Sequence, residues 1–551
     1  MPPQQVYWKT GRDSSYRNRF KHYFGTDESY FELIKNYKTD WERFLFYVNE
    51  AKVKKYTTED NFLNELPTIE ESQLNLNELD LKSVDEGYFQ SRFHNEIGLK
   101  IINGDGGELD LKLDENVTDL MEFAKRKAKI VSPGGQVTAL KWLPNPLDDE
   151  SGVSYLAIGV INNPKGISDS INNPELSMYS KSSNERGINS CIQIWKYDVK
   201  ENEFSLENVL ITTTMGAVSD LKWAPFHTTG NTLGVLVGAF TDGDVHLFKI
   251  NKSLPSKYNI VNKSSYTYTS TYSTKRTKSD PNSNITCFDF LSIDKIIIGC
   301  VDGYISEFIL PFHPHYSTDT NPTLPSYRTR FSDAPITSIL AANYAPGEYL
   351  IVINSASTQC MAYDYTDPTQ CFCSPLVSKS TTPPSYNHAL RCFGVTPSHD
   401  ATGYSFIRVP QETASGLLKA SASVSCNVLG ERLGHPLNLT GFANGDIVVL
   451  NFARRHLQGG KITSKVLVPL KLWKLELAEG TEAGEVKAGS FVLRAGYESC
   501  DVESPMTPSF MPPEVAISAL GWNENVIGSS VYAAGTISGL LIVERLDPKG
   551  L

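Results

Sequence analysis

The sequence lacks the features that mark membrane and secreted proteins. No apolar run approaches the roughly 18 residues that a membrane span needs, and residues 1–20 are polar and charged, so we expect neither a transmembrane helix nor a signal peptide. The nine cysteines are odd in number and fall mostly in predicted strands. This pattern favours reduced core thiols in an intracellular protein over a disulfide framework.

Motifs for catalysis and for metal binding are also missing. The Gly-Gly-Lys run at 459–461 is followed by Ile462, where a phosphate loop needs Ser or Thr, and no Gly-x-Ser-x-Gly elbow is present. The His pair in 313–315 and the Cys pair in 371–373 lack the spacing and the second pair of a zinc site. We therefore expect a protein that is not an enzyme and that binds no cofactor and no metal.

What the sequence does contain is a phrase that recurs along the chain. It consists of Val or Ile, then Ser or Thr, then a short stretch that often ends on an aromatic residue. It occurs at 137–142, 218–223, 285–290 and 517–522, with weaker copies at 336–339 and 424–428. Such repetition indicates that one small unit is stacked several times to build the core.

A hairpin signal follows most copies of the phrase. An apolar run reaches a two-residue turn such as Asp242-Gly243, Asp302-Gly303, Asn444-Gly445 or Ser538-Gly539, and an alternating strand comes next. Asp-Gly and Asn-Gly are strong hairpin signals, because a tight turn needs positive φ angles that Gly and Asn adopt easily. Each unit is thus strand, turn, strand, turn and strand, with room for a fourth strand.

Both signals together give seven units. They lie near 134–199, 216–250, 284–310, 334–365, 385–410, 421–452 and 514–546, and in the fifth the segment 389–393 stands where the phrase should be. Units of about 40 to 45 residues with four strands are typical of a WD-repeat β-propeller, whereas a β-sandwich has no reason to repeat one phrase at the start of each sheet. We predict an all-β fold, a seven-bladed degenerate WD-repeat β-propeller with a partly helical N-terminal extension.

Charge divides the chain into three parts. Residues 1–55 carry 11 Lys and Arg against 7 Asp and Glu, and residues 60–123 carry 4 against 16. We expect a basic, partly helical segment (1–59), an acidic linker that can wrap the propeller (60–127), and the propeller itself (128–551) with insertions at 161–190, 251–283 and 453–513. Candidates for the strand that closes the ring are 98–113, 125–132 and the C-terminus; closure by the N-terminal segment is expected, because it leaves no edge strand.

One helix is predicted ahead of the propeller. Apolar residues recur at three- and four-residue spacing from Tyr30 to Val48, and Ser29 with Glu32 forms a capping-box pattern. Such a face must be covered, either by the flank of the propeller or by another subunit. For the second alternative, the candidate docking residues are Tyr37, Trp41, Phe44 and Leu45.

Two basic segments are candidates for nucleic-acid or partner contact. Basic residues in 251–283 are interleaved with tyrosines, a mixture that suits a phosphate backbone and stacked bases, although such loops are often merely solvated. The candidates are Lys252, Lys257, Lys263, Lys275, Arg276 and Lys278, together with Lys125, Arg126 and Lys127.

The opening units resemble a known family. The stretches 134–144, 155–160, 192–196 and 216–225 join the phrase to a Trp-x-Pro exit and a long first insertion. In these features the chain resembles the WD-repeat subunit of transcription factor IIIC, of the fungal tau type that belongs to the B-block-binding module. Family members usually have a longer basic N-terminal extension than the mildly basic residues 1–55 here.

The resemblance implies a non-catalytic nuclear scaffold subunit. It would pair with a second β-propeller subunit and with the large DNA-binding subunit, and would support B-block recognition and transcription of transfer-RNA genes by RNA polymerase III. Contact with promoter DNA would run mainly through the complex, with no membrane and no small-molecule substrate. The alternative is a chromatin-associated or generic WD-repeat scaffold that binds peptide or histone partners.

Overall fold

Seven sheets of four or more strands make up most of the computed structural model. The structure describes residues 12–42, 46–57, 65–162, 188–269, 284–312, 325–345, 348–357, 360–367, 371–373, 382–398, 401–419, 422–453, 469–479, 490–500 and 511–547. We number the sheets 1 to 7 in chain order of the strand that opens each of them.

Each sheet has a core of four strands. Sheet 1 contains β7 (Gln136–Trp142), β8 (Val153–Asn162), β9 (Asn189–Asp198) and β10 (Glu203–Ile211); sheet 2 contains β11 (Val218–Trp223), β13 (Thr232–Phe240), β14 (Val245–Asn251) and β16 (Tyr266–Tyr268). Sheet 3 contains β17 (Ile285–Ser292), β18 (Lys295–Cys300), β19 (Tyr304–Ile309) and β20 (Tyr327–Arg330); sheet 4 contains β21 (Ile336–Ala345), β22 (Glu348–Ser355), β23 (Cys360–Asp364) and β24 (Cys371–Cys373). Sheet 5 contains β25 (Ser385–Asn387), β26 (Cys392–Ser398), β27 (Ala401–Phe406) and β28 (Val409–Lys419). Sheet 6 contains β29 (Val424–Leu429), β30 (Leu437–Phe442), β31 (Asp446–Asn451) and β32 (Leu470–Leu477); sheet 7 contains β35 (Ile517–Trp522), β36 (Val531–Thr536), β37 (Leu541–Arg545) and β6 (Ala128–Val131).

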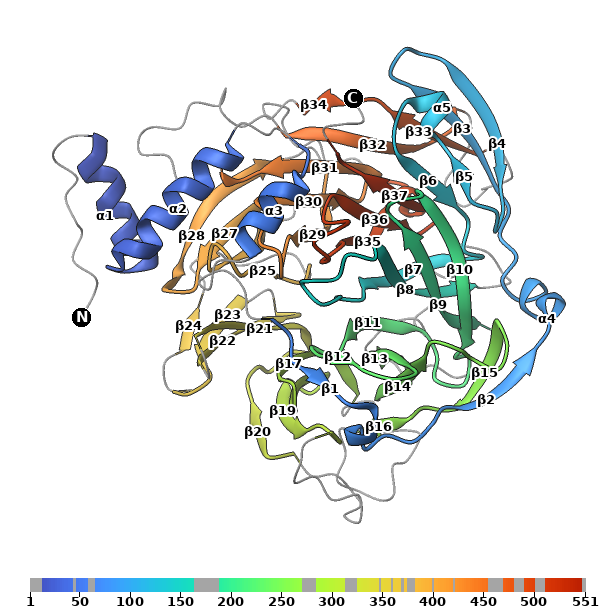
Figure 1. Cartoon of the computed structure of the whole chain (residues 1–551), viewed down its shortest axis with the longest axis horizontal. Helices are drawn as coiled ribbons and strands as arrows, with labels where there is room; N and C mark the ends of the chain where they lie inside the picture. The colour runs from blue at the N-terminus through green and yellow to red at the C-terminus, as the bar shows by residue number, and fades with distance from the viewer. Residues whose placement is uncertain are drawn as a thin grey trace.

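The sheets form a closed ring. The opening strand of each sheet contacts that of the next, in the order β7, β11, β17, β21, β25, β29 and β35, and β35 contacts β7 again. Figure 1 shows the sheets arranged around a common centre. The all-β propeller predicted from the sequence is thereby confirmed.

The recurring phrase occupies the opening strands, and its Ser or Thr has a structural role. In every copy the register between the first two strands shifts at this residue, which is the position of a β-bulge. The hydroxyl of Ser518 donates to the carbonyl of Val137 at 2.6 Å, and that of Thr286 donates to Ile336. These two bonds join neighbouring sheets.

The Val or Ile of the phrase packs against a glycine of the preceding sheet. A Cβ at Gly159 would lie 2.0 Å from Val218, and one at Gly535 would lie 2.4 Å from Val137. Both distances are far inside van der Waals contact, so a side chain at either glycine would push the sheets apart. This explains why a small residue precedes the hairpin turn.

The structure corrects the fifth unit. Its opening strand is β25, and the segment 389–393, which stood in for the phrase, leads into β26 instead. The hydroxyl of Tyr386 in β25 bonds the carbonyl of Asn343 in sheet 4. The unit is divergent because its opening strand is short and does not carry the phrase. The bond from Tyr386 joins this strand to sheet 4 instead.

Two of the predicted insertions contain strands of the ring. Residues 251–283 include β15 (Tyr258–Lys263) and β16, and residues 453–513 include β32, β33 (Phe491–Ala495) and β34 (Glu498–Ser499). Of 161–190, residues 163–187 lie outside the described residues. Within the third insertion, the alternating stretch 470–477 is β32, the fourth core strand of sheet 6.

The acidic segment runs along the ring as a belt, which we define as residues 68–131. It comprises β1 (Thr68–Ile69), β2 (Asp80–Val84), β3 (Ile97–Asn103), β4 (Glu108–Leu113), β5 (Thr118–Asp119) and β6, with short helices η1 (Glu71–Gln73), α4 (Glu86–Gln90) and α5 (Met121–Ala124). β1 pairs with β12 (His227–Thr228), β2 extends sheet 1 through β15, and β3 with β4 extends sheet 6 through β33. β6 pairs with β37, which confirms closure of the ring by the N-terminal segment.

In the described residues before the belt lie the helices α1 (Arg12–Phe24), α2 (Glu28–Trp41) and α3 (Glu50–Thr57). A short helix, η6 (Pro513–Val515), precedes β35. The predicted single helix from Tyr30 to Val48 was wrong in extent, since α2 ends at Trp41. Its predicted cap was also wrong, because Asp27 accepts bonds from the backbone N–H groups of Ser29 and Tyr30. Among the described residues, no helix is both long and apolar enough to span a membrane.

Candidate interaction surfaces

The apolar face of α2 packs on the ring of its own chain. Tyr30 and Tyr37 are each 1% exposed, and their hydroxyls donate to the carbonyls of Ala389 and Gly434. The side chain of Asn451 donates to the carbonyl of Trp41 at 2.8 Å. The helix therefore joins the core of sheets 5 and 6, the first of the two alternatives left open by the sequence.

This packing settles whether two of the four predicted docking residues are accessible to a partner. Tyr37 and Trp41 are each 1% exposed, so their side chains offer no surface to another subunit, and that prediction was wrong. Phe44 and Leu45 lie outside the described residues. Sequence periodicity revealed the apolar face but not its cover, which comes from residues about 400 positions away.

Arg126 is not a surface contact, although the sequence suggested one. It is 3% exposed, and its Nε and Nη2 each bond a carboxylate oxygen of Glu544 at 2.7 Å. The guanidinium lies 3.7 Å from the ring centre of Trp473, and Trp473 and Tyr532 also donate to Glu544. The prediction of nucleic-acid or partner contact by Arg126 was wrong, because this charge belongs to a buried cluster beside the ring closure.

The neighbours of Arg126 differ from it in exposure. Lys125 is exposed, and its Nζ lies 3.7 Å from Asp105. Lys127 is half-buried, with Nζ 3.5 Å from Asp547. These three consecutive basic residues therefore do not form one basic surface.

The basic insertion lies against the acidic belt. Lys252, Lys257 and Lys263 are exposed, whereas Tyr258 and Tyr268 are buried and cannot stack on bases. β15 pairs with β2 so that Lys263 is opposite Asp80. Lys275, Arg276 and Lys278 lie outside the described residues.

A lysine of sheet 2 ties the belt to the ring. Lys249 is 6% exposed, and its Nζ lies 3.0 Å from Glu71 and also pairs with Glu78. A hydrogen bond from the backbone N–H of Asn231, together with Lys249, lowers the pKa of Glu71 to about 2. Part of the negative charge of the belt is thus matched within the chain.

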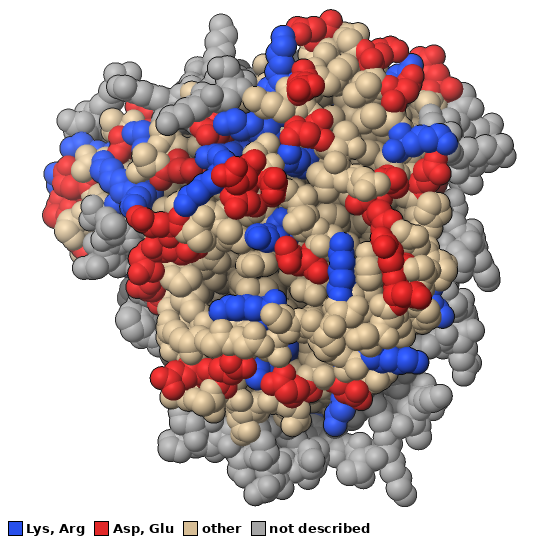
Figure 2. All heavy atoms as spheres, turned by 45° about the vertical axis from the view of Figure 1, so that its right-hand side comes forward, with Lys and Arg blue, Asp and Glu red and all other residues tan. Residues whose placement is uncertain are grey.

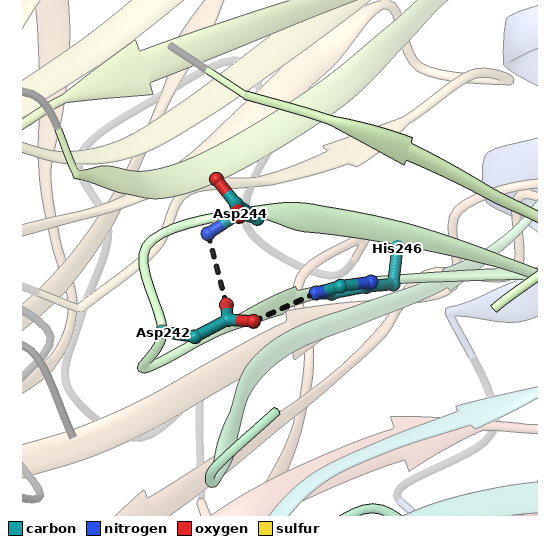
Figure 3. Close-up of side chains that lie close together, drawn as sticks. All are labelled: Asp242, Asp244 and His246. Carbon is teal, nitrogen blue, oxygen red and sulfur yellow. Dashed lines mark hydrogen bonds and ion pairs between the residues drawn. The ribbon is translucent and has the colours of Figure 1, made fainter. Parts of the chain in front are cut away.

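Among the residues that the structure describes, one group of carboxylate and imidazole side chains lies close enough together to hold a metal ion. Asp242, Asp244 and His246 sit at the β13–β14 turn, as Figure 3 shows. His246 Nε2 lies 2.9 Å from Asp242 Oδ2, Nδ1 lies 3.0 Å from Ser264 Oγ, and the backbone N–H of Asp244 donates to Asp242. Because both ring nitrogens have hydrogen-bond partners, this group stabilises the hairpin and links it to the loop before β16.

A second polar network joins sheets 1, 6 and 7 in and after their opening strands, and sequence reasoning missed it. Lys141 of β7 pairs with Glu431, which follows β29, at 2.6 Å. The buried carboxylate of Glu524, which follows β35, accepts bonds from the backbone N–H groups of residues 431 to 433. Burial and the nearby Glu431 raise the pKa of Glu524. The sequence signal that could have revealed this network is a lysine at the fifth position of the phrase, which occurs at Lys141 and again at Lys222.

Charges of both signs are interspersed over the face shown in Figure 2. Acidic and basic side chains alternate there over much of the surface, with apolar and neutral residues between them. Such a mixed surface suits contacts with proteins better than a continuous phosphate backbone, which requires a basic stripe.

No family model matches the chain. The transcription factor tau 91 kDa subunit of Saccharomyces cerevisiae is 27% identical to it over 465 residues, which cover 80% of this chain. The chain spans 62% of the length of that yeast protein. The similarity and the closed ring of sheets agree with the resemblance found in the opening units. The chain is therefore a β-propeller protein similar to the tau 91 kDa subunit of yeast.

Proposed function

We propose that this protein is a non-catalytic scaffold subunit of transcription factor IIIC. The observation that carries the proposal is the similarity to a yeast transcription factor subunit over 80% of the chain. The close-packed ring supports it, because polar groups such as the Ser518 hydroxyl and the Glu524 carboxylate form bonds that join neighbouring sheets.

The proposed partners are a second β-propeller subunit and the large DNA-binding subunit of the factor. Through them the protein supports recognition of the B-block promoter and transcription of transfer-RNA genes by RNA polymerase III in the nucleus. We also propose that the ring has seven blades, one for each sheet of four or more strands. The segments 1–59, 60–127 and 128–551 then correspond to the helical extension, the acidic segment and the propeller.

Promoter DNA is contacted mainly through the complex. Five of the basic candidates among the described residues remain for an accessory contact, since Lys125, Lys252, Lys257 and Lys263 are exposed and Lys127 is half-buried. Lys275, Arg276 and Lys278 belong to the same proposal. Their role would be electrostatic, with affinity that falls steeply as salt rises.

Affinity purification of the tagged full chain from nuclear extract, read by mass spectrometry, tests this function. We expect a second propeller protein and the large B-block-binding subunit in amounts close to equimolar with the bait. A matched purification of an unrelated tagged propeller controls for adhesion. Recovery of the chain without either subunit would refute the proposal.

A further inference from the structure

A cavity of about 240 Å³ lies where the belt crosses sheet 1. Its apolar lining comes from Phe89 and Phe93, in and after α4, and from Trp195 and Leu206 on β9 and β10. The volume is enough for about eight waters at liquid density. It is therefore large enough for one long side chain but small for most drug-sized ligands.

The aromatic floor of this cavity is held in place by its surroundings. Phe89 stacks on Phe93 with ring centres 5.1 Å apart, and Trp195 stacks on Phe204 at 4.7 Å. Trp195 Nε1 donates to Gln193 Oε1 at 3.0 Å, and Gln193 Nε2 donates to the carbonyl of Pro133 at 2.6 Å. These bonds use the polar atoms of Trp195 and of the Gln193 amide, so the floor is preformed and offers mainly apolar contact.

The mouth of the cavity is acidic. Asp114 is exposed and Glu115 is half-buried, and both belong to the lining. Glu115 accepts one bond from Gln90 Nε2 at 2.7 Å, and Asp114 accepts one from the backbone N–H of Asn116 at 2.8 Å. Since a carboxylate can accept about four hydrogen bonds, each has capacity left for a cationic ligand.

Carboxylates lie near the floor, and one cation lies beside them, since Lys257 Nζ is 5.7 Å from the ring centre of Tyr258. Burial and the negative charges of Glu86 and Glu115 raise the pKa of Tyr258 to about 12, and Tyr258 stacks on Phe89 with ring centres 5.0 Å apart. The cavity lining contains no lysine or arginine, and His94 is its one basic side chain. A phosphate group would be repelled here, whereas a cation on a flexible apolar stem would meet complementary surfaces at both ends.

We infer that this cavity is a docking site for a lysine or arginine side chain from a basic segment of a partner protein. The methylene stem lies against Phe93 and Leu206, and the charged head pairs with Asp114 and Glu115 at the mouth. This site is independent of the proposed function, because it predicts a peptide contact whichever complex the protein joins.

The test uses the full chain and a fluorescein-labelled peptide of alternating glycine and lysine, with fluorescence anisotropy as the readout. The same peptide with glutamine in place of lysine is the neutral probe. We expect the lysine peptide to bind, the glutamine peptide to bind at least tenfold more weakly, and the Asp114→Asn, Glu115→Gln double variant to weaken lysine-peptide binding about fivefold, in line with two partly exposed ion pairs.

A matched double variant separates the cavity from the general charge of the belt. Asp110 and Glu122 are exposed belt carboxylates outside the cavity lining, so Asp110→Asn, Glu122→Gln removes the same charge elsewhere. We expect this control to retain binding within about twofold. Equal weakening in the two double variants would overturn the inference, as would equal binding of the lysine and glutamine peptides.

Filling the floor provides a second, uncharged test. Leu206→Phe narrows the cavity without changing any charge and should also weaken the lysine peptide several-fold, while leaving the melting temperature close to that of the parent. Should this variant fail to fold, Leu206→Met serves in its place. Unchanged lysine-peptide binding by a folded floor variant would contradict insertion of the side chain.

Discussion

The N-terminal helices and the acidic belt both lie on the outside of the ring, but different interactions attach them. The helices are held by side chains, since Tyr30, Ile34, Tyr37 and Trp41 are each at most 1% exposed against sheets 5 and 6. The belt is held by backbone pairing with β12, β15, β33 and β37. Strand addition thus distinguishes the belt from the helices, although belt side chains such as Ile101 and Leu120 are buried as well.

This difference has a consequence for cooperativity. Removal of α2 would expose apolar surface on sheets 5 and 6 but would leave each of their core strands in place. Removal of β6 would leave β37 as an open edge of sheet 7, because β6 is the fourth strand of that sheet. We therefore expect the helices to undock locally, whereas the end of the belt should unfold only together with the ring.

The largest effect is expected at the buried cluster beside the ring closure. Glu544→Gln leaves the Arg126 guanidinium buried without its carboxylate, and breaking such a pair costs about 3 to 5 kcal/mol in the free energy of unfolding. Urea unfolding followed by tryptophan fluorescence measures this. Glu476→Gln, on the partly exposed pair with Arg494, is the control and should change stability by less than about 1 kcal/mol. Similar losses in the free energy of unfolding for the two variants would show that the buried cluster stabilises the protein no more than a partly exposed ion pair does.

A substitution that undocks the helices should have a smaller effect on the main unfolding transition, which is that of the ring. Trp41→Ala removes a 1% exposed indole and should weaken helix docking by about 3 to 5 kcal/mol. Limited proteolysis should then release the N-terminal helices while the ring stays resistant. Asn36→Ala, on the exposed side of α2, should leave the digestion pattern unchanged. Simultaneous loss of ring resistance would contradict local undocking.

Removal of Lys249, the cation that pairs with two carboxylates of the belt, should have a smaller effect on stability. Lys249→Ala removes the partner of Glu71 and Glu78, whose side chains are 30% and 62% exposed, so the loss should be about 1 kcal/mol. Hydrogen exchange should show protection of 68–84 falling about fivefold, with 28–41 unaffected. Lys252→Ala, whose Nζ bonds the carbonyl of Gly230, is the matched control on the same sheet. Unchanged protection would mean that strand pairing alone holds the belt.

The two segments should also respond to opposite ends of the pH scale. The pKa of Glu71 is lowered from 4.5 to about 2, so its contact stabilises the belt above pH 4.5 and is lost as the pH falls toward 2. Burial raises the pKa of Tyr37 well above 10, so helix docking is intact below pH 10 and weakens as the pH rises further. Hydrogen exchange across the pH range, corrected for intrinsic rates, measures both. Glu71→Gln should remove the acid response and leave the alkaline one.

Much of the ring was predictable because its signals are local. The phrase, the Asp-Gly and Asn-Gly turns and the alternating strands lie within a few residues of one another, and they located six of the seven opening strands. The fifth failed because β25 is only three residues long and does not carry the phrase. The bulge at Thr138 and its equivalents needed the structure, since register is a property of two strands.

The candidate contact residues were less predictable because their environment is set by distant partners. Trp41 and Asn451 are separated by 410 residues, and Arg126 and Glu544 by 418. The local sequence showed that the face of Trp41 must be covered but not by what, and Arg126 stands in a run of basic residues that resembles an exposed segment. The cavity under α4 had no sequence signal at all, because belt and sheet 1 contribute to it from separate parts of the chain.

By itself, the sequence determined the repeated unit, the all-β ring and the division into basic, acidic and near-neutral parts. Tertiary structure alone decided which of these parts cover one another, which charges are buried and where a cavity remains. The physical reason is the distance along the chain over which each interaction acts. Turn and strand preferences act between neighbours along the chain, whereas burial and ion pairing act between surfaces that meet only after the ring has closed.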